Sequence, residues 1–385
     1  MTNKHTDGKL SRTILSISLL TVMAGAAIAP ALGIIRDHFA GAPDMLVQLI
    51  VSLPALLIIL ANLAFPRICA LMKTRTLALT GLVLYIVAGA GCFFCDNIYI
   101  LLDMRAVLGV SVGMIMPLST GLLAYYFPPE KQASLMGLSA AMNQMGGVIA
   151  TLLAGMLANI CWNYAFLVYL LGLIAVVLVA LFLPNERLSG GSTPSLRMLK
   201  KFHPSVVGMF LVMLLFFIYP TRFAICAHEC TSLPNNAITL IMVGLDVVAF
   251  IIGLMFGSMM KHFRHGMKYI APIGFIIGYI LLSMGTRLPL LIAGSAFIGI
   301  ANGIGVPYLN TIASMKAGRE AASTVMPLLS AALYLGQFLS PIIVTPLGAL
   351  LSEASDPLAP FKAGILIGVI YLLQSHFTRR QQTVE

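Results

Sequence analysis

Asp246 is the side chain best placed for chemistry, because it lies near the middle of an apolar run from about Asn236 to Ser258. A carboxylate in such a run is costly if the run crosses a membrane, and it then usually faces protein or water. Away from bulk water it takes up a proton more readily. We therefore predict that Asp246 binds a proton or another cation, and a structural carboxylate satisfied by a hydroxyl or an arginine is the alternative.

The helical face that carries Asp246 is polar or built from small residues. Its members at heptad-like steps are Asn235, Thr239, Met242, Ala249, Gly253 and Gly257. Such a face is expected to contact protein or a wet cavity and not lipid.

Arg105 is a second charge inside an apolar run. Asp103, two residues earlier, projects from another side of a helix and cannot neutralise it neatly. A charge at this depth needs a functional reason. The alternatives are that the side chain reaches outward to the interface or forms a structural pair.

Arg222 and a set of uncharged polar residues complete the candidate site. Arg222 follows Pro220 near one end of its run, where it could attract an anionic substrate group or simply reach lipid headgroups. The uncharged residues could line a substrate site between two halves, and packing hydrogen bonds are the alternative. They are Gln48, Asn143, Gln144, Asn302, Asn310, Tyr334 and Gln337.

An ungapped shift of 190 residues superimposes the two halves of the sequence. It places Gly109 on Gly299, Gly113 on Gly303, Pro117 on Pro307 and Gly146 on Gly336. Internal repeats of this kind are typical of secondary transporters. These residues, with Gly147, are predicted to let helices approach closely or bend.

The composition excludes a soluble globule. Hydrophobic residues make up 59% of the 385 positions and charged residues only 9%, and the mean hydropathy is +0.97. The net charge of +10 comes from bases in short loops, so membrane and not nucleic acid is the expected partner. The first apolar run continues past the length of a signal peptide's core, and we interpret it as a retained span.

Apolar runs long enough to cross a bilayer occur twelve times. They centre near Ala24, Ala55, Ile86, Ser111, Gly146, Ala175, Leu215, Val247, Ile277, Asn302, Leu333 and Gly368. We predict an all-α membrane protein with twelve transmembrane helices in two pseudo-symmetric six-helix bundles. The bundles would span 1–183 and 205–385, joined by a polar linker over 184–204.

The bases also predict the orientation. If the N-terminus is cytoplasmic, most of the 23 Lys and Arg residues fall on the cytoplasmic side, and both termini lie there.

Three fragments in order resemble the major facilitator superfamily over essentially the whole chain. RAVLGVSVG, which begins at Arg105, is similar to the family's fourth-helix motif, YYFPPEKQASLMGL to the hairpin that follows, and WNYAFLV to the start of the sixth helix, with Asn163 where a base is usual. The loop FPRICALMKTRTLAL lacks the usual acid, and GGVIATLLAG lacks the proline of the export signature.

The resemblance implies two halves that rock about a midplane cavity lined mainly by helices 1, 4, 7 and 10. It also implies that Arg105 takes part in proton transfer or contacts the substrate. We therefore expect proton-coupled efflux of a small organic molecule, with Asp246 as the titrating group and Arg105 as its electrostatic counterweight. Uptake of an anionic metabolite and a non-transporting membrane sensor are the alternatives.

The sequence supports neither catalysis nor a cofactor. There is no glycine-rich phosphate loop and no nucleophile with a plausible base. Cys226, His228 and Cys230 form a weak metal motif, and uncoupled thiols are the favoured interpretation. We expect a monomer in a bacterial inner (plasma) membrane.

Overall fold

All regular structure in the described part of the chain is helical. The computed structural model describes residues 4–127, 129–187, 196–263, 266–285, 287–352 and 356–377, and these ranges contain no strand. The predicted all-α fold is confirmed. The shift of 190 residues also pairs Glu130 with Glu320, and both side chains lie outside the described part of the structure. The side chains of the bases Arg264, Arg379 and Arg380 lie outside it as well.

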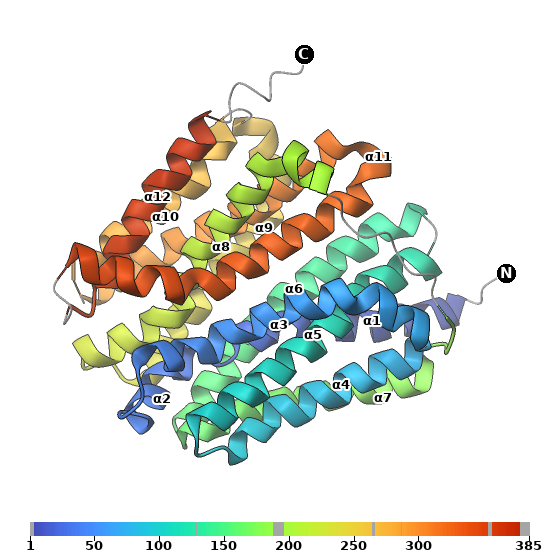
Figure 1. Cartoon of the computed structure of the whole chain (residues 1–385), viewed down its shortest axis with the longest axis horizontal. Helices are drawn as coiled ribbons and strands as arrows, with labels where there is room; N and C mark the ends of the chain where they lie inside the picture. The colour runs from blue at the N-terminus through green and yellow to red at the C-terminus, as the bar shows by residue number, and fades with distance from the viewer. Residues whose placement is uncertain are drawn as a thin grey trace. The chain divides into compact units, whose positions relative to one another are not determined.

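The chain divides into two compact units, Met1–Ser192 and Thr193–Glu385. Figure 1 colours the first from blue to green and the second from yellow-green to red. The second unit's first helix begins at Leu196, so it starts inside the range 184–204 that the sequence suggested as a linker.

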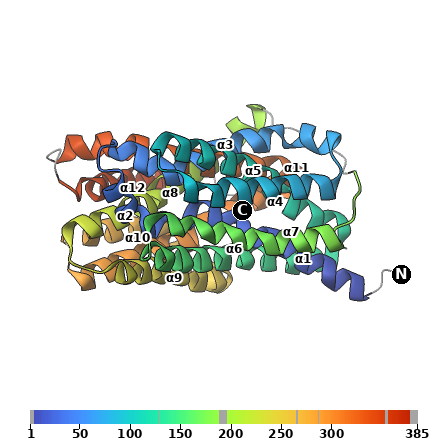
Figure 2. The same cartoon turned by 90° about the horizontal axis from the view of Figure 1, so that it is seen from below.

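Unit 1 consists of six spans, three of which include a 3-10 segment. Its helices α4 and α5 lie side by side (Figure 2). The helices α3, α4 and α5 pack on one another, and α1 packs on α6. The elements are α1 (Lys4–Ala26), η1 (Ala29–Ala31), α2 (Leu32–His38), α3 (Asp44–Leu71), α4 (Thr74–Gly91), η2 (Cys92–Phe94), α5 (Ile98–Tyr126), α6 (Pro129–Ala158), η3 (Trp162–Leu171) and α7 (Gly172–Phe182).

Unit 2 has the same number of spans in fewer elements. They are α8 (Leu196–Cys230), α9 (Asn235–Phe263), α10 (Met267–Ser283), α11 (Leu288–Leu351) and α12 (Ala359–Phe377). The sequence predicts two separate helices near Asn302 and Leu333, but α11 is one continuous element of 64 residues. Figure 1 shows that α11 turns back on itself, so its two limbs still make two spans.

The predicted count of twelve spans is confirmed. In the described ranges, ten segments are long and apolar enough to cross a membrane. The shorter apolar helix α10, with 17 residues, and α12, with 19, make up the remaining two.

The first span differs from the continuous helix that hydropathy predicts. The α-helix α1 ends at Ala26, a 3-10 turn containing Pro30 follows, and helix α2 resumes at Leu32. Proline lacks the amide hydrogen that a continuing helix needs, which accounts for a break at this place. The carbonyl groups of the last turn of α1 therefore need partners from elsewhere in the bundle.

Close glycine contacts repeat in both units at the spacing of the internal duplication. A methyl group added to Gly109 would meet the carbonyl oxygen of Pro54, and one added to Gly299 would meet that of Leu245. Each contact joins the second and fourth spans of its own unit, and Gly113 and Gly303 repeat the pattern one turn later. Gly146 and Gly336 likewise pack on backbone of the first span of their units. Pro117 lies inside α5, and Pro307 lies inside α11.

Residues after α7 are tied back to the start of α4 and the end of α5. The amide and hydroxyl of Thr74 donate to the carbonyl oxygens of Glu186 and Pro184, both at 2.8 Å. Tyr126 donates its hydroxyl hydrogen to the Glu186 carboxylate at 3.3 Å. The backbone of Glu186 thus places an acidic residue at the start of α4, next to the loop between α3 and α4, which has no acid of its own.

We expect Gly303→Ala to destabilise the protein and Gly253→Ala to leave it unchanged or slightly more stable. An added methyl group at Gly303 would lie 2.7 Å from the Ala249 carbonyl oxygen, whereas one at Gly253 would meet nothing within 4 Å. Overpacking costs about 1 to 3 kcal/mol, while alanine in an open helix position gains a few tenths to about 1 kcal/mol.

Thermal unfolding of the two purified variants in detergent measures this difference. Equal melting temperatures for both variants would contradict the close approach of α9 and α11.

Candidate functional site

The Arg105 guanidinium joins four spans of unit 1. It is fully buried in α5 and donates from Nε to the Ile50 carbonyl oxygen of α3 at 2.6 Å. From Nη1 it donates to the Tyr169 hydroxyl of η3 at 2.6 Å, and from Nη2 to the Ala24 carbonyl oxygen of α1 at 2.5 Å. Its Cζ also lies 5.6 Å from the centroid of the Tyr169 ring.

The contact with Ala24 explains why an arginine is needed at this depth. Ala24 lies in the last turn of α1, which ends at Ala26, and its carbonyl accepts from Arg105 and from the Tyr169 hydroxyl at 3.2 Å. A cation is favoured beside the negative C-terminal end of a helix, and hydrogen bonds from a charged donor are strong. Arg105 and Tyr169 therefore cap the break in the first span.

Two further groups hold Tyr169 in this position. The ring of Tyr85 packs edge-on against that of Tyr169, with centroids 5.5 Å apart, and its hydroxyl donates to the Leu20 carbonyl oxygen at 3.3 Å. Gly89 supports the ring from α4, where an added methyl group would lie 2.5 Å from the Tyr169 Cγ. Tyr169 is not among the residues predicted from the sequence, although a tyrosine in an apolar run usually needs a hydrogen-bond partner.

The burial of Arg105 excludes the interpretation that its side chain reaches outward to the interface. Its three hydrogen bonds go to two carbonyls and a phenol of unit 1, and in the described part of the chain no carboxylate pairs with it. Asp103 is exposed, as expected from its place on another side of the helix. Asp246 belongs to unit 2, and its coupling to Arg105 stays a prediction.

Asp246 lies half-buried on α9. Tyr219 of α8 and Ser295 of α11 are buried, and their hydroxyl oxygens lie 2.7 Å apart in a hydrogen bond. The Tyr219 hydroxyl is close enough to Asp246 for an electrostatic interaction. Of the predicted small and polar face, Thr239 and Ala249 are buried, but the glycines at 253 and 257 are exposed.

Two buried oxygens of unit 2 lack hydrogen-bond partners in the described part of the chain, Thr239 Oγ1 on α9 and Asn302 Oδ1 on α11. Asn302 lies between two glycines of α11 that pack on α9 on either side of Asp246, so Asn302 and Asp246 share one level of the helix pair. Thr239 is two turns from Asp246 on the same face. An unsatisfied buried acceptor costs about 1 to 3 kcal/mol, so these atoms favour a water, a proton carrier or a ligand hydroxyl.

Arg222 is half-buried in α8 and donates from Nη2 to the Thr345 hydroxyl of α11 at 3.1 Å. One helical turn further, the Cys226 thiol donates to the Pro357 carbonyl oxygen at 2.9 Å. In the described ranges, no three His, Cys, Asp or Glu side chains come together as metal ligands.

The uncharged polar residues of unit 1 include a packing pair between α1 and α6. Thr21 donates its hydroxyl hydrogen to Asn143 Oδ1 at 2.9 Å, and the hydroxyl oxygens of Ser18 and Ser139 lie 2.7 Å apart on the same two helices. An added methyl group on Gly147 would lie 3.3 Å from the Val22 side chain of α1. Asn143 therefore links the first and fifth spans, and its role in binding stays a prediction.

Burial places the remaining candidates. Gln48 on α3 and Gln337 on α11 are buried, whereas Gln144 on α6 and Asn310 and Tyr334 on α11 are half-buried. Their roles in binding stay predictions.

Comparison with known sequences decides the family. The model of the Major Facilitator Superfamily matches residues 14–341 of this chain. The chain belongs to the major facilitator superfamily. It is a multi-pass secondary transporter and not an enzyme.

Solved structures of this superfamily share the fold along the whole chain. A bacterial homologue of the human lysosomal transporter Spinster, inward-facing and unoccupied, has a TM-score of 0.80 and 14% identity and covers 99% of each chain. A point mutant of the nucleoside transporter NupG has a TM-score of 0.77 and 10% identity, covering 97% of this chain and 100% of that chain. A D-xylose–proton symporter has a TM-score of 0.73 and 14% identity, covering 94% and 97%. At these identities the likeness concerns the fold alone.

Curated superfamily relatives match a shorter part of the chain. The multidrug transporter protein MdtP of Bacillus subtilis (strain 168) is 25% identical over 126 residues, which are 32% of this chain and 23% of that protein. The multidrug resistance protein B homolog of Mycobacterium tuberculosis (strain ATCC 25618 / H37Rv) is 31% identical over 116 residues, 30% of this chain and 22% of that protein. The matches thus span less than a quarter of each relative.

We expect Tyr169→Phe to destabilise this transporter more than Tyr85→Phe. Loss of the Tyr169 hydroxyl removes one partner of the buried Arg105 guanidinium and one donor to the Ala24 carbonyl. Leaving a charged group short of a hydrogen bond costs about 1 to 3 kcal/mol, whereas the single neutral bond of Tyr85 contributes about 1 kcal/mol.

The two phenylalanine variants differ from the wild type by one hydroxyl each, and thermal unfolding of both in the same detergent compares them. An equal or larger loss for Tyr85→Phe would show that Arg105 does not depend on Tyr169.

Proposed function

We propose that this superfamily member exports small apolar or amphiphilic organic molecules in exchange for protons, with Asp246 as the titrating group. The observation that carries the proposal is the place of Asp246 near the middle of α9, where its carboxylate acts electrostatically on the buried Tyr219 hydroxyl. Asp103 is another acid inside an apolar helix. It is exposed and lies near the start of α5.

The surroundings of Asp246 suit a proton that is taken up and released. The Tyr219 hydroxyl on α8 interacts electrostatically with Asp246, and the amide oxygen of Asn302 on α11 can accept a hydrogen bond from a water or a ligand. Coupling requires only that the protonated and ionised forms of Asp246 favour different conformations.

Arg105 has a positioning role in this proposal. Its guanidinium is fully buried and donates to three partners of unit 1. We infer that it fixes the break in the first span and so shapes the wall of the transport path, without contacting the substrate itself. Discontinuous helices are common beside substrate and ion sites of secondary transporters.

The choice of export and of apolar cargo rests on the relatives named as multidrug proteins. The same relatives are bacterial, which supports a bacterial inner membrane. The bases of the sequence support cytoplasmic termini. We propose that the protein works as a monomer, because each unit contributes its own complete bundle of six spans.

Uptake of an anionic metabolite is the second candidate, and the half-buried Arg222 on α8 favours it. Deletion of the protein separates the two candidates. Export predicts that cells without it become more susceptible to some members of a chemically diverse panel of amphiphilic drugs. Unchanged susceptibility across the whole panel would favour uptake.

Asp246→Asn should remove the pH dependence of transport and abolish concentrative transport, because the amide cannot bind or release a proton. Asp103→Asn is the matched control, since it makes the same substitution at an exposed position of α5. Ethidium transport into everted membrane vesicles, measured across a range of pH, gives both profiles.

We expect a flat profile for Asp246→Asn and the wild-type profile for Asp103→Asn, with equal amounts of folded protein. A wild-type profile for Asp246→Asn would refute its role in coupling.

A further inference from the structure

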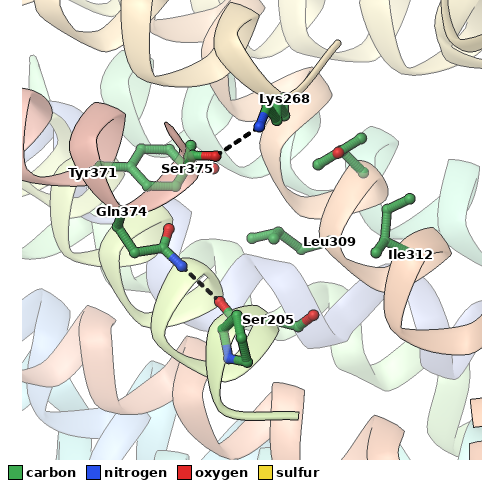
Figure 3. Close-up of a pocket in the computed structure, with 9 residues that line it drawn as sticks. Ser205, Lys268, Leu309, Ile312, Tyr371, Gln374 and Ser375 are labelled. Carbon is green, nitrogen blue, oxygen red and sulfur yellow. Dashed lines mark hydrogen bonds between the residues drawn. The ribbon is translucent and has the colours of Figure 1, made fainter. Parts of the chain in front are cut away.

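Unit 2 contains a small cavity with a lysine in its lining, at the end of the unit that the bases predict to face the cytoplasm (Figure 3). Its volume is about 30 Å³, which is room for a water or for part of a small polar group. Four helices of the unit, α8, α10, α11 and α12, enclose it. The lining residues are Pro204, Ser205, Lys268, Tyr308, Leu309, Ile312, Tyr371, Gln374 and Ser375.

Lys268 gives the cavity a positive charge. Its Nζ donates to the Ser375 carbonyl oxygen at 3.0 Å and lies 4.8 Å from the centroid of the Tyr269 ring (Figure 3). None of the lining residues is acidic, and within the described part of the chain no carboxylate pairs with Lys268. An ammonium has three hydrogens to donate, so Lys268 can serve an anion in addition to these contacts.

Neutral donors lie around the same space. Ser205 and Tyr308, which both carry hydroxyl groups, line the cavity beside Lys268. Gln374 donates from Nε2 to the Pro204 carbonyl oxygen at 2.9 Å, which holds the ends of α8 and α12 together. A lysine with two hydroxyls is a donor set that suits phosphate oxygens.

A second cation lies one turn beyond the lining on α11. Lys316 is exposed, follows Ile312 by four residues, and places Nζ 6.0 Å from the centroid of the Phe202 ring. Because positions four apart share a helical face, Lys316 extends the positive charge of the cavity toward the bilayer surface.

The neighbouring face of α12 is apolar and exposed, which indicates contact with acyl chains. Its large side chains recur at helical spacing next to the lining positions Gln374 and Ser375. They are Leu366, Val369, Ile370, Leu373 and Phe377, exposed by 39% to 74%.

We propose that this cavity binds the phosphate of an anionic phospholipid of the cytoplasmic leaflet, with the acyl chains along α12. Lys268, Ser205 and Tyr308 would contact the phosphate. A lipid suits the site better than free phosphate because the charged cavity and the apolar face adjoin each other, and basic pockets on the cytoplasmic side favour anionic lipids. This inference does not rest on the proposed direction or coupling of transport.

Binding of dioleoyl phosphatidylglycerol to the purified full chain, followed by native mass spectrometry, tests the proposal. Lys268→Gln should weaken the apparent affinity by about fivefold, which corresponds to the loss of one lysine near an anionic surface. Lys9→Gln is the matched control, because Lys9 also lies over an aromatic ring, that of Phe182, but in unit 1. Dioleoyl phosphatidylcholine should bind all three proteins equally weakly.

A second variant keeps the test decisive if Lys268→Gln fails to fold. The double variant Ser205→Ala with Tyr308→Phe removes the two hydroxyls and leaves the Lys268 contact with the end of α12 in place. It should also lose the preference for phosphatidylglycerol. Wild-type binding in a folded variant would overturn the site. Full competition by inorganic phosphate would overturn the assignment to a lipid.

Discussion

The need to satisfy the backbone inside a bilayer governs the structure of unit 1. No water is available in the hydrocarbon region, so a carbonyl freed by a helix break must find a partner within the protein. The first span breaks after Ala26, and the Arg105 guanidinium and the Tyr169 hydroxyl reach the Ala24 carbonyl from two other spans. Gly89 packs against the Tyr169 ring and holds it in place. Together, Arg105, Tyr169 and Gly89 therefore satisfy the carbonyl at the helix break.

The two halves of the chain share their packing but differ at their polar centres. Gly109 and Gly299 meet the carbonyls of corresponding helices, as the duplication requires. The same shift places Arg105 on Ser295, and that serine joins Tyr219 in a neutral hydroxyl pair. Unit 1 therefore holds a buried arginine whose hydrogen bonds all stay inside the unit, whereas unit 2 holds a half-buried carboxylate that interacts electrostatically with a tyrosine. This difference supports a division between a rigid wall and a titrating site.

Much of the fold could be predicted from the sequence. Hydropathy indicates the number of membrane spans, and the repeated glycines indicate where helices pack closely. The helix break after Ala26 could have been inferred from Pro30. Hydropathy alone does not show the break, because the residues on both sides of it are apolar. The continuous course of α11 and the contact of Glu186 with Thr74 depend on backbone geometry and on residues far apart in sequence. Likewise, the depth of Arg105 indicated a special residue, while its partners Ile50, Ala24 and Tyr169 could only come from the packed bundle.

Proton movement driven by substrate alone tests the central claim most directly. Proteoliposomes of the purified transporter would hold a trapped pH indicator and an imposed gradient of ethidium, with no initial pH difference. The proposed exchange predicts that ethidium flowing down its gradient drives protons the opposite way, and that the signal disappears in Asp246→Asn. Ethidium flux through the wild-type protein with no accompanying proton movement would contradict it.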